Sequence, residues 1–296
     1  MLLDFTVTHQ QWMYTNLYTT LSILGAILVL VIAYGVRLLL KGRAQFARVD
    51  KQGGSVLLGK SLMEMAYWWI QPLARLFIFF KITPNMLSWT SLFFGFLSGV
   101  CLAFGHFGFG GAFALVCGFL DSLDGLVARL TGAQSQAGEL LDSTIDRYAE
   151  AFFLAGLVIH YREYTVMQVI TIMALIGSYM VSYSSAKAEI MRIEPMKGTM
   201  RRAERAFYLT AGALLSPITI PIFESVRDTK TAIAHPMVIA LCLIAVLSNV
   251  SAIERMMYIA RKAADRKKAE EAQALEVSQQ KNVGTAAVTE QSVKPR

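Results

Sequence analysis

Seven apolar segments recur along this chain, and each is long enough to cross a lipid bilayer as a helix. A span takes roughly 20 residues. Of the 296 residues, 55% are hydrophobic and only 17% are charged, which argues against an ordinary soluble globule. The predicted spans cover about residues 17–40, 86–105, 109–130, 139–160, 166–191, 204–223 and 236–260. We therefore expect an all-α fold: a polytopic membrane helix bundle with a six-helix core and one extra N-terminal transmembrane helix.

The basic residues between these segments predict how the chain is oriented. Lys and Arg gather in three clusters, at residues 37–60, 187–205 and 255–268. Because cytoplasmic loops are enriched in Lys and Arg, all three clusters are expected in the cytoplasm and the N-terminus outside. Anionic lipid headgroups then explain the net charge of +7 better than nucleic acid does.

Four regions follow from this order. Residues 1–60 hold the N-terminal transmembrane helix and a basic linker. Residues 61–82 are amphipathic and aromatic, which predicts a helix lying in the cytoplasmic interface. Residues 83–262 form the core, with Pro84 near the first turn of its first helix. Residues 263–296 are polar and rich in Gln, Ala and Val, and we expect a disordered cytoplasmic tail.

Four aspartates lie within this apolar sequence, where ionisable side chains are costly and mark functional sites. They are Asp121, Asp124, Asp142 and Asp146. At helical spacing the first two share one arc of their helix, while Gly138 and the second two form an i, i+4, i+8 stripe on the next. The facing carboxylates would repel each other unless cations lie between them. All-oxygen ligation favours Mg²⁺ or Mn²⁺, with Ca²⁺ in a roomier site, and four carboxylates can hold two ions.

Divalent ions at a membrane boundary suit phosphate chemistry, because they neutralise phosphate charge and polarise the phosphorus. Arg129, one turn after the first acidic pair, can hold a phosphate with its fork of donors. Asp146 can serve as the general base that takes a proton from an attacking hydroxyl. The alternative is a buried ion-pair network that only holds helices together. Such a network requires neither the glycines nor this register.

The same residues resemble the signature of the CDP-alcohol phosphatidyltransferases. That signature reads Asp-x2-Asp-Gly-x2-Ala-Arg-x8-Gly-x3-Asp-x3-Asp and is present without a gap or substitution, within a resemblance over roughly residues 70–262. The implied two-metal centre consists of Asp121, Asp124, Asp142 and Asp146, with Asp146 as the catalytic base. The implied CDP-lipid site consists of Asp121, Gly125, Ala128, Arg129 and Gly138. The implied reaction moves a phosphatidyl group from CDP-diacylglycerol to a small alcohol and releases CMP, in a homodimer.

A second, basic cluster bears on the acceptor alcohol. Ser182, Lys187, Arg205 and Arg255 resemble the acceptor region of the phosphatidylinositol-phosphate synthases of bacteria and their archaeal counterparts. Inositol phosphate is therefore the favoured acceptor, and basic side chains suit a phosphorylated one. Ser185 departs from that pattern, in which a basic residue is usual, so glycerol 3-phosphate, serine or another alcohol stays open. Three other arginines are interpreted as a positive-inside girdle: Arg192, Arg201 and Arg202.

A function of another class, a carrier for divalent metal or protons, would also place acids within spans. A carrier needs a polar path to both membrane faces, whereas the segments at 113–119 and 152–159 beyond the acids are apolar. The enzyme is therefore favoured. We expect a multi-pass protein of the cell (inner) membrane with its active site on the cytoplasmic side, and no nucleic-acid partner.

Overall fold

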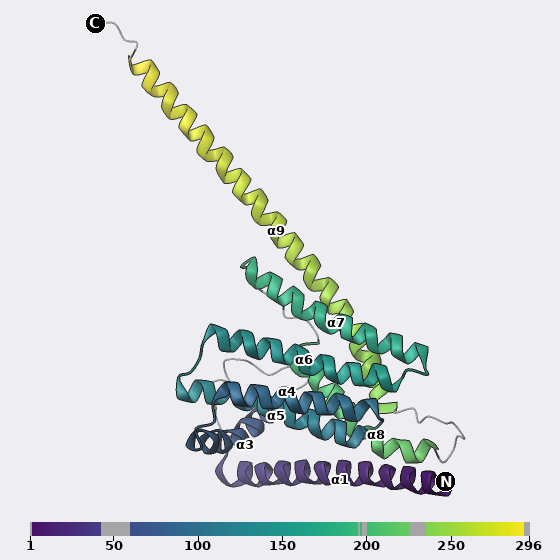
Figure 1. The fold of residues 1–296 in the computed structure, drawn as a ribbon. Helices are drawn as coiled ribbons and strands as arrows, with labels where there is room; N and C mark the ends of the chain where they lie inside the picture. The colour runs from purple at the N-terminus through teal and green to yellow at the C-terminus, as the bar shows by residue number, and fades with distance from the viewer. Residues whose placement is uncertain (1, 43–59, 195, 197–199, 225–234, 293–296) are drawn as a thin grey trace.

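The chain folds into a bundle of long helices (Figure 1). The structure, a computed structural model, describes residues 2–42, 60–194, 196, 200–224 and 235–292. Its helices are α1 (Leu2–Lys41), α3 (Lys60–Phe79), α4 (Pro84–Ala103), α5 (Phe107–Thr131), α6 (Gln136–His160), α7 (Thr165–Ile190), α8 (Arg202–Glu224) and α9 (His235–Ser292). Every regular element in these ranges is a helix, which confirms the all-α prediction. The predicted linker at 43–59 and the chain end at 293–296 lie outside the described residues.

Five of the described helices are long and apolar enough to cross a membrane. The qualifying segments are Gln11–Leu40, Pro84–Ala103, Phe107–Thr131, Thr165–Ile190 and His235–Gln273. The helices α6 and α8, with 25 and 23 residues, are long enough as well but contain charged residues such as Asp146 and Arg205. Both run alongside the other helices in the bundle (Figure 1). The helix α3 occupies the segment predicted to lie in the membrane interface.

Local capping signals set the helix ends near the acidic residues. The hydroxyl of Thr83 accepts a hydrogen bond from the Met86 amide at 3.4 Å, just before α4. The helix α5 ends at Thr131 and is capped by Gly132, whose φ of 67° is left-handed and suits glycine. Ser135 then caps α6 by accepting a hydrogen bond from the Gly138 amide at 3.0 Å. This tight reversal brings the end of α5 and the start of α6 to the same end of the bundle.

The helix α4 packs closely against both α5 and α6. A Cβ atom on Gly99 would collide with the carbonyl oxygen of Phe152, and one on Gly156 would collide with the carbonyl oxygen of Gly99. On the other side, the hydroxyl of Ser98 donates to the carbonyl oxygen of Gly110 at 2.7 Å. Small residues allow such close backbone contact between membrane helices. The helix α4 therefore fixes the positions of the two helices that carry the aspartates.

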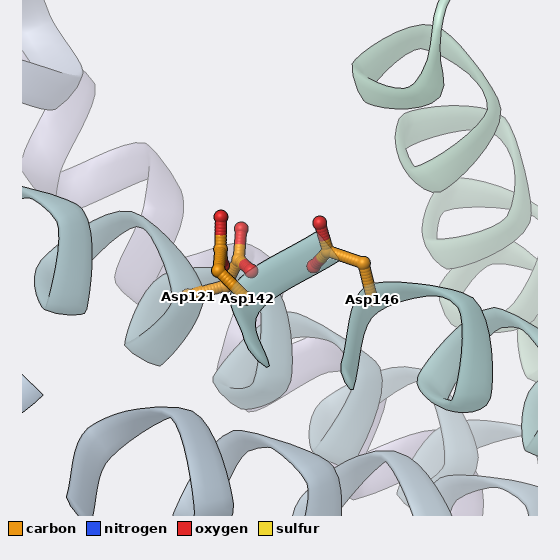
Figure 2. A group of neighbouring side chains, drawn as sticks. All are labelled: Asp121, Asp142 and Asp146. Carbon is orange, nitrogen blue, oxygen red and sulfur yellow. The ribbon is translucent and has the colours of Figure 1, made fainter. Parts of the chain in front are cut away.

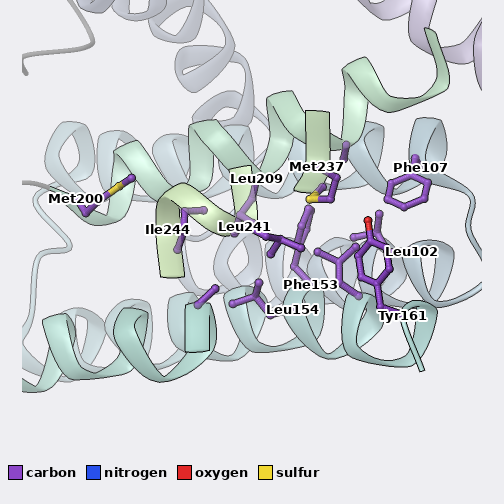
Figure 3. Packing of buried hydrophobic residues seen from close by; sticks show 13 residues of the cluster. Leu102, Phe107, Phe153, Leu154, Tyr161, Met200, Leu209, Met237, Leu241 and Ile244 are labelled. Atoms are coloured by element: carbon purple, nitrogen blue, oxygen red, sulfur yellow. The ribbon is translucent and has the colours of Figure 1, made fainter. Parts of the chain in front are cut away.

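The main hydrophobic core lies toward the end of the bundle opposite the acidic residues. It joins the end of α4 and the start of α5 to α6, α7, α8 and the start of α9 (Figure 3). Among its fully buried members are Leu102, Phe107, Leu154, Met237 and Leu241. A second, smaller cluster joins α3, α4 and α5 beside the aspartates. The site is thus built next to a packed framework and not inside its largest core.

The extra N-terminal helix is part of this framework. The helix α1 packs against α5 and α8. The side-chain oxygen of Asn16 accepts a hydrogen bond from the Gly108 amide at 3.1 Å, at the start of α5. Toward the other end of α1, the guanidinium carbon of Arg37 lies 5.2 Å from the ring centroid of Trp68 in α3, a cation–π distance. Contacts near both ends of α1 therefore join it to the rest of the bundle.

The C-terminal tail differs from its prediction. In place of a disordered segment from residue 263, α9 continues as one helix to Ser292 and projects beyond the bundle (Figure 1). Its charged residues are spaced for i, i+4 pairing: Arg266 lies 3.0 Å from Glu270, and Lys267 lies 3.7 Å from Glu271. Ala, Glu, Gln and Lys, which are strong helix formers, dominate this stretch. A polar composition alone therefore did not distinguish a solvated helix from disorder.

Candidate active site

Three of the four aspartates meet in one small cluster. Asp121 comes from α5, and Asp142 and Asp146 come from α6. One carboxylate oxygen of each lies within 4.8 Å of the others. Their carboxylates point into the same space between the two helices (Figure 2). Asp146 is buried, while Asp121 and Asp142 are half-buried. We call these three residues the acidic cluster.

The fourth aspartate lies beside this cluster but faces α4. Asp124 is only 4% exposed, and its Oδ2 accepts a hydrogen bond from the Ser88 hydroxyl at 2.5 Å. The carboxylates of Asp121 and Asp142 act on it electrostatically. Ser88 is not among the residues predicted for the site, although it belongs to a stripe of small residues on the buried face of α4. That stripe is the signal that could have indicated a polar contact there.

A guanidinium group lies against the acidic cluster. Nη2 of Arg202, the first residue of α8, is 3.0 Å from Oδ1 of Asp121 and also pairs with Oδ1 of Asp146. The position of Arg202 in a basic segment of the sequence predicts a role in the positive-inside girdle. The structure instead places its charge between carboxylates that are distant in sequence. Opposite charges this close stabilise the ionised carboxylates.

A second arginine of α8 pairs with the next acidic residue along α6. Arg205 is 1% exposed, and its Nε and Nη2 donate to the two carboxylate oxygens of Glu150 at 2.7 and 3.0 Å. Its Nη1 donates to the Met200 carbonyl oxygen at 3.2 Å. Glu150 follows Asp146 by one helical turn, so the acidic stripe continues further than predicted. The spacing of Glu150 at i+4 from Asp146 is the sequence signal that could have predicted this residue as part of the site.

The predicted CDP-lipid residues lie around the same end of α5. A Cβ atom on Gly125 would lie 3.2 Å from Nη1 of Arg129. The guanidinium group of Arg129 therefore lies next to the space that the missing side chain of Gly125 leaves open. Ala128 and Arg129 are half-buried. Gly138 is placed in the first turn of α6, where its amide is used in capping by Ser135. Gly125 and Arg129 thus act as a local pair, whereas Gly138 also serves the start of its helix.

The predicted acceptor residues are brought together only in part. Arg255 of α9 is buried, and its Nη1 donates to the Ser185 hydroxyl at 2.9 Å. Arg205 and Arg201 act on it electrostatically, and its Nε is buried without a hydrogen-bond partner in the structure. The Ser182 hydroxyl donates back to its own helix at the carbonyl of residue 178, 3.1 Å away. Lys187 is exposed near the end of α7.

The acidic cluster fits a divalent cation. Its donor atoms are all carboxylate oxygens, the type that Mg²⁺ and Mn²⁺ prefer, and they come from two helices that α4 holds at a fixed spacing. The positively charged side chain of Arg202 already lies against two of the three carboxylates. A site that attracts a guanidinium in this way is suited to a metal cation as well.

Residues 81–247 match the family model of CDP-alcohol phosphatidyltransferase. The chain belongs to the CDP-alcohol phosphatidyltransferase family. The residues that carry the family signature are therefore those that this structure places at the ends of α5 and α6. The prediction of a transferase is confirmed, and the carrier hypothesis is set aside.

Two named relatives and two solved structures show where this phosphatidyltransferase stands in its family. It is 35% identical over 143 residues to the archaetidylinositol phosphate synthase of Pyrococcus horikoshii, covering 48% of this chain and 74% of the relative. It is 28% identical over 200 residues to the phosphatidylinositol phosphate synthase of Cutibacterium acnes, and this match covers 65% of this chain and 92% of the relative.

The solved structures are those of Mycobacterium tuberculosis phosphatidylinositol phosphate synthase. The structure in complex with manganese and citrate matches this chain with a TM-score of 0.55 and 22% sequence identity. The match covers 64% of this chain and 88% of the M. tuberculosis chain. The structure with CDP-DAG bound matches this chain with a TM-score of 0.54, again at 22% identity. This match covers 64% of this chain and 92% of the M. tuberculosis chain. At this level of identity the likeness establishes the shared fold. The phosphatidyltransferase fold accordingly confirms the prediction of a polytopic helix bundle.

Proposed function

We propose that this enzyme transfers the phosphatidyl group of CDP-diacylglycerol to inositol phosphate and releases CMP. The observation that carries the acceptor assignment is the buried Arg255, which has an unpartnered Nε and lies under the electrostatic influence of Arg205 and Arg201. Arg205 already pairs with Glu150. Glu204 also acts on Arg255, but the Nε of Arg255 is left for a further anion, and the planar guanidinium group matches phosphate geometry. The names of the two relatives agree with an inositol phosphate acceptor.

The acceptor pocket would be built around this group. Arg255 and Lys187 would neutralise the acceptor phosphate, and Ser182 would bind a hydroxyl. Arg205 uses three of its five N–H donors on Glu150 and Met200, so two donors would remain to line the pocket. Because Arg205 is almost fully buried, its main effect would be to hold α6 and α8 in place beside the pocket.

The acidic cluster and Asp124 would hold two divalent ions, Mg²⁺ or Mn²⁺. When bound, such ions neutralise the charge of a pyrophosphate and polarise its phosphorus. Asp146 would accept the proton of the acceptor hydroxyl as the hydroxyl oxygen forms its bond to the β-phosphorus. The bond between that phosphorus and the oxygen of the leaving CMP breaks in the same transfer. Asp146 suits the base role because it is the most buried carboxylate of the acidic cluster.

The donor lipid would bind at the same end of α5. Arg129 would hold the donor's phosphates with its fork, while Gly125, Ala128 and Gly138 would leave space for the nucleotide. Asp121 would contribute from the cluster side. Exposed apolar side chains along α4 and α7, such as Phe93 and Ile176, are suited to contact with lipid chains.

We place the active site on the cytoplasmic side of the cell (inner) membrane, with the N-terminus outside. Basic side chains gather near the ends of the other predicted spans, which is the pattern of cytoplasmic loops. Examples are Arg37 of α1, Lys81 between α3 and α4, Lys187 and Arg192 at the end of α7, and Lys262 of α9. The family resemblance further suggests a homodimer. The enzyme would require no nucleic-acid partner.

A different acceptor is favoured by one observation. Ser185 stands where the resembled pattern has a basic residue, and it accepts a hydrogen bond from Arg255. The pocket therefore has one cation fewer than that pattern, which would suit glycerol 3-phosphate or an unphosphorylated alcohol such as serine.

CMP release by the purified protein tests this function. The protein would receive CDP-diacylglycerol, Mg²⁺ and one acceptor at a time: inositol phosphate, inositol, glycerol 3-phosphate or serine. We expect the highest kcat/KM with inositol phosphate, and Arg255→Ala should raise the KM for that acceptor with little effect on the KM for the donor. A higher kcat/KM with glycerol 3-phosphate or serine would transfer the assignment to that acceptor.

A further inference from the structure

The contact between Arg202 and the acidic cluster has no counterpart in the family signature. The guanidinium pairs with Asp121 of α5 and Asp146 of α6, two of the three carboxylates that could ligate a metal. These residues are separated from Arg202 by 81 and 56 positions in the chain. A guanidinium and a divalent cation cannot both occupy the space between the same two carboxylates at contact distance.

The backbone at the start of α8 is held in place independently of Arg202. Glu204 accepts a hydrogen bond from the Arg201 amide at 2.9 Å, which satisfies a free donor of the first turn. Arg205 is fastened to Glu150 by two hydrogen bonds, and Met200 is buried at 3% exposure. Removing the Arg202 side chain from the cluster would therefore leave the start of α8 where it is.

The two arginines of this turn differ sharply in exposure. The side chain of Arg202 is 48% exposed and that of Arg205 is 1% exposed. A half-exposed guanidinium can turn toward water or lipid phosphates and lose little, because new partners replace the old ones. The side chain of Arg205 is therefore held in place, whereas the side chain of Arg202 can move while the backbone at the start of α8 stays fixed.

We propose that Arg202 is a built-in competitor of the divalent ion. It neutralises the acidic cluster while the metal is absent and turns outward when a divalent ion binds to Asp121 and Asp146. This inference rests on the proposed metal centre. Arg202 is thus a positioning residue that keeps the carboxylates close together before the metal arrives, and it lowers the apparent affinity of the site for metal.

The size of the effect follows from population arithmetic. If the guanidinium occupies the cluster for about nine-tenths of the time in the metal-free protein, only about one molecule in ten is ready to bind, and the apparent affinity falls about tenfold. Removing the guanidinium should therefore tighten metal binding. It should also make the metal-free protein less stable, since three close carboxylates lose their counter-charge.

The test is Mn²⁺ binding by the full-length, chelator-stripped protein, measured from the electron paramagnetic resonance signal of free Mn²⁺. We expect Arg202→Gln to lower the apparent Kd for Mn²⁺ about tenfold and Arg202→Lys to give an intermediate value. Arg266→Gln, which removes one equal charge from the exposed part of α9, is the matched control and should bind like the wild type. The Mn²⁺-induced rise in Tm should be larger in Arg202→Gln than in the wild type.

The outcomes separate this inference from the proposed function. Equal or weaker Mn²⁺ binding by Arg202→Gln, with normal binding by the wild type, would overturn the competitor role and leave the metal centre intact. Failure of the wild type to bind Mn²⁺ would overturn the metal centre and the competitor role together. Use of an acceptor other than inositol phosphate would change the proposed function without affecting this result.

Discussion

Replacing Arg205 by alanine tests how much of this site is structural support. The side chain is 1% exposed and donates three hydrogen bonds, two of them to the Glu150 carboxylate. Glu150 itself is 14% exposed. Arg205→Ala would leave this carboxylate desolvated and without its counter-charge, and it would also remove a large buried side chain between α6 and α8.

The magnitude follows from these contacts. Breaking a buried, hydrogen-bonded ion pair by removing one partner costs about 3–5 kcal/mol. The double variant Arg205→Ala/Glu150→Ala should lose less than the sum of the two single variants, with a coupling energy on the order of 1–3 kcal/mol, because the second change removes the stranded charge. An exposed pair provides the comparison: Arg266 and Glu270 are 60% and 64% exposed, and Arg266→Ala should cost less than about 1 kcal/mol.

The assay is unfolding of the detergent-solubilised protein in SDS, followed by tryptophan fluorescence, with the wild type, the two single variants, the double variant and Arg266→Ala in parallel. A loss in Arg205→Ala no larger than that in Arg266→Ala would refute the reasoning. Strict additivity of the two single changes would refute it as well. A raised KM for the acceptor at unchanged stability would assign Arg205 to acceptor binding alone.

Three further predictions concern the reacting groups and the helix packing. Asp146→Asn should abolish CMP release while CDP-diacylglycerol binding persists, because an amide cannot take the hydroxyl proton; undiminished turnover would remove Asp146 from the base role. A chelator should stop CMP release and added Mg²⁺ or Mn²⁺ should restore it, whereas activity that survives exhaustive chelation would count against the metal centre. Gly156→Val should destabilise the bundle by about 1–3 kcal/mol in the same SDS assay, because its side chain would meet the Gly99 backbone. Gly118→Val, at an open position on α5, is its control and should cost far less.

The sequence was most informative where the signal is local. Hydropathy predicted helix positions closely: the span expected at about 109–130 is α5, Phe107–Thr131, and the one expected at about 139–160 is α6, Gln136–His160. The tail was the exception, because a solvated helix and a disordered segment share a polar composition. Helical spacing also predicted that all four carboxylates would point inward together; the structure brings Asp121, Asp142 and Asp146 together, while Asp124 pairs with Ser88 of α4.

Contacts between distant segments could not be predicted in this way. Ser88 pairs with Asp124 across 36 positions, and Arg205 pairs with Glu150 across 55. Each pair depends on the crossing of two helices, and no pattern within either helix indicates which partner it will meet. In the sequence, Arg202 resembles the other basic residues of a cytoplasmic loop. Its pairing with Asp121 and Asp146 depends on the position of α8 beside α5 and α6.

By itself, the amino-acid sequence determined that this protein is a helical membrane transferase and which aspartates are the candidates for its reactive centre, because hydrophobic period and motif spacing are properties of neighbouring residues. Only the tertiary structure decided which cations oppose those aspartates. The reason is physical: the energy of a charge pair depends on distance and burial, and both are set by how separate helices pack.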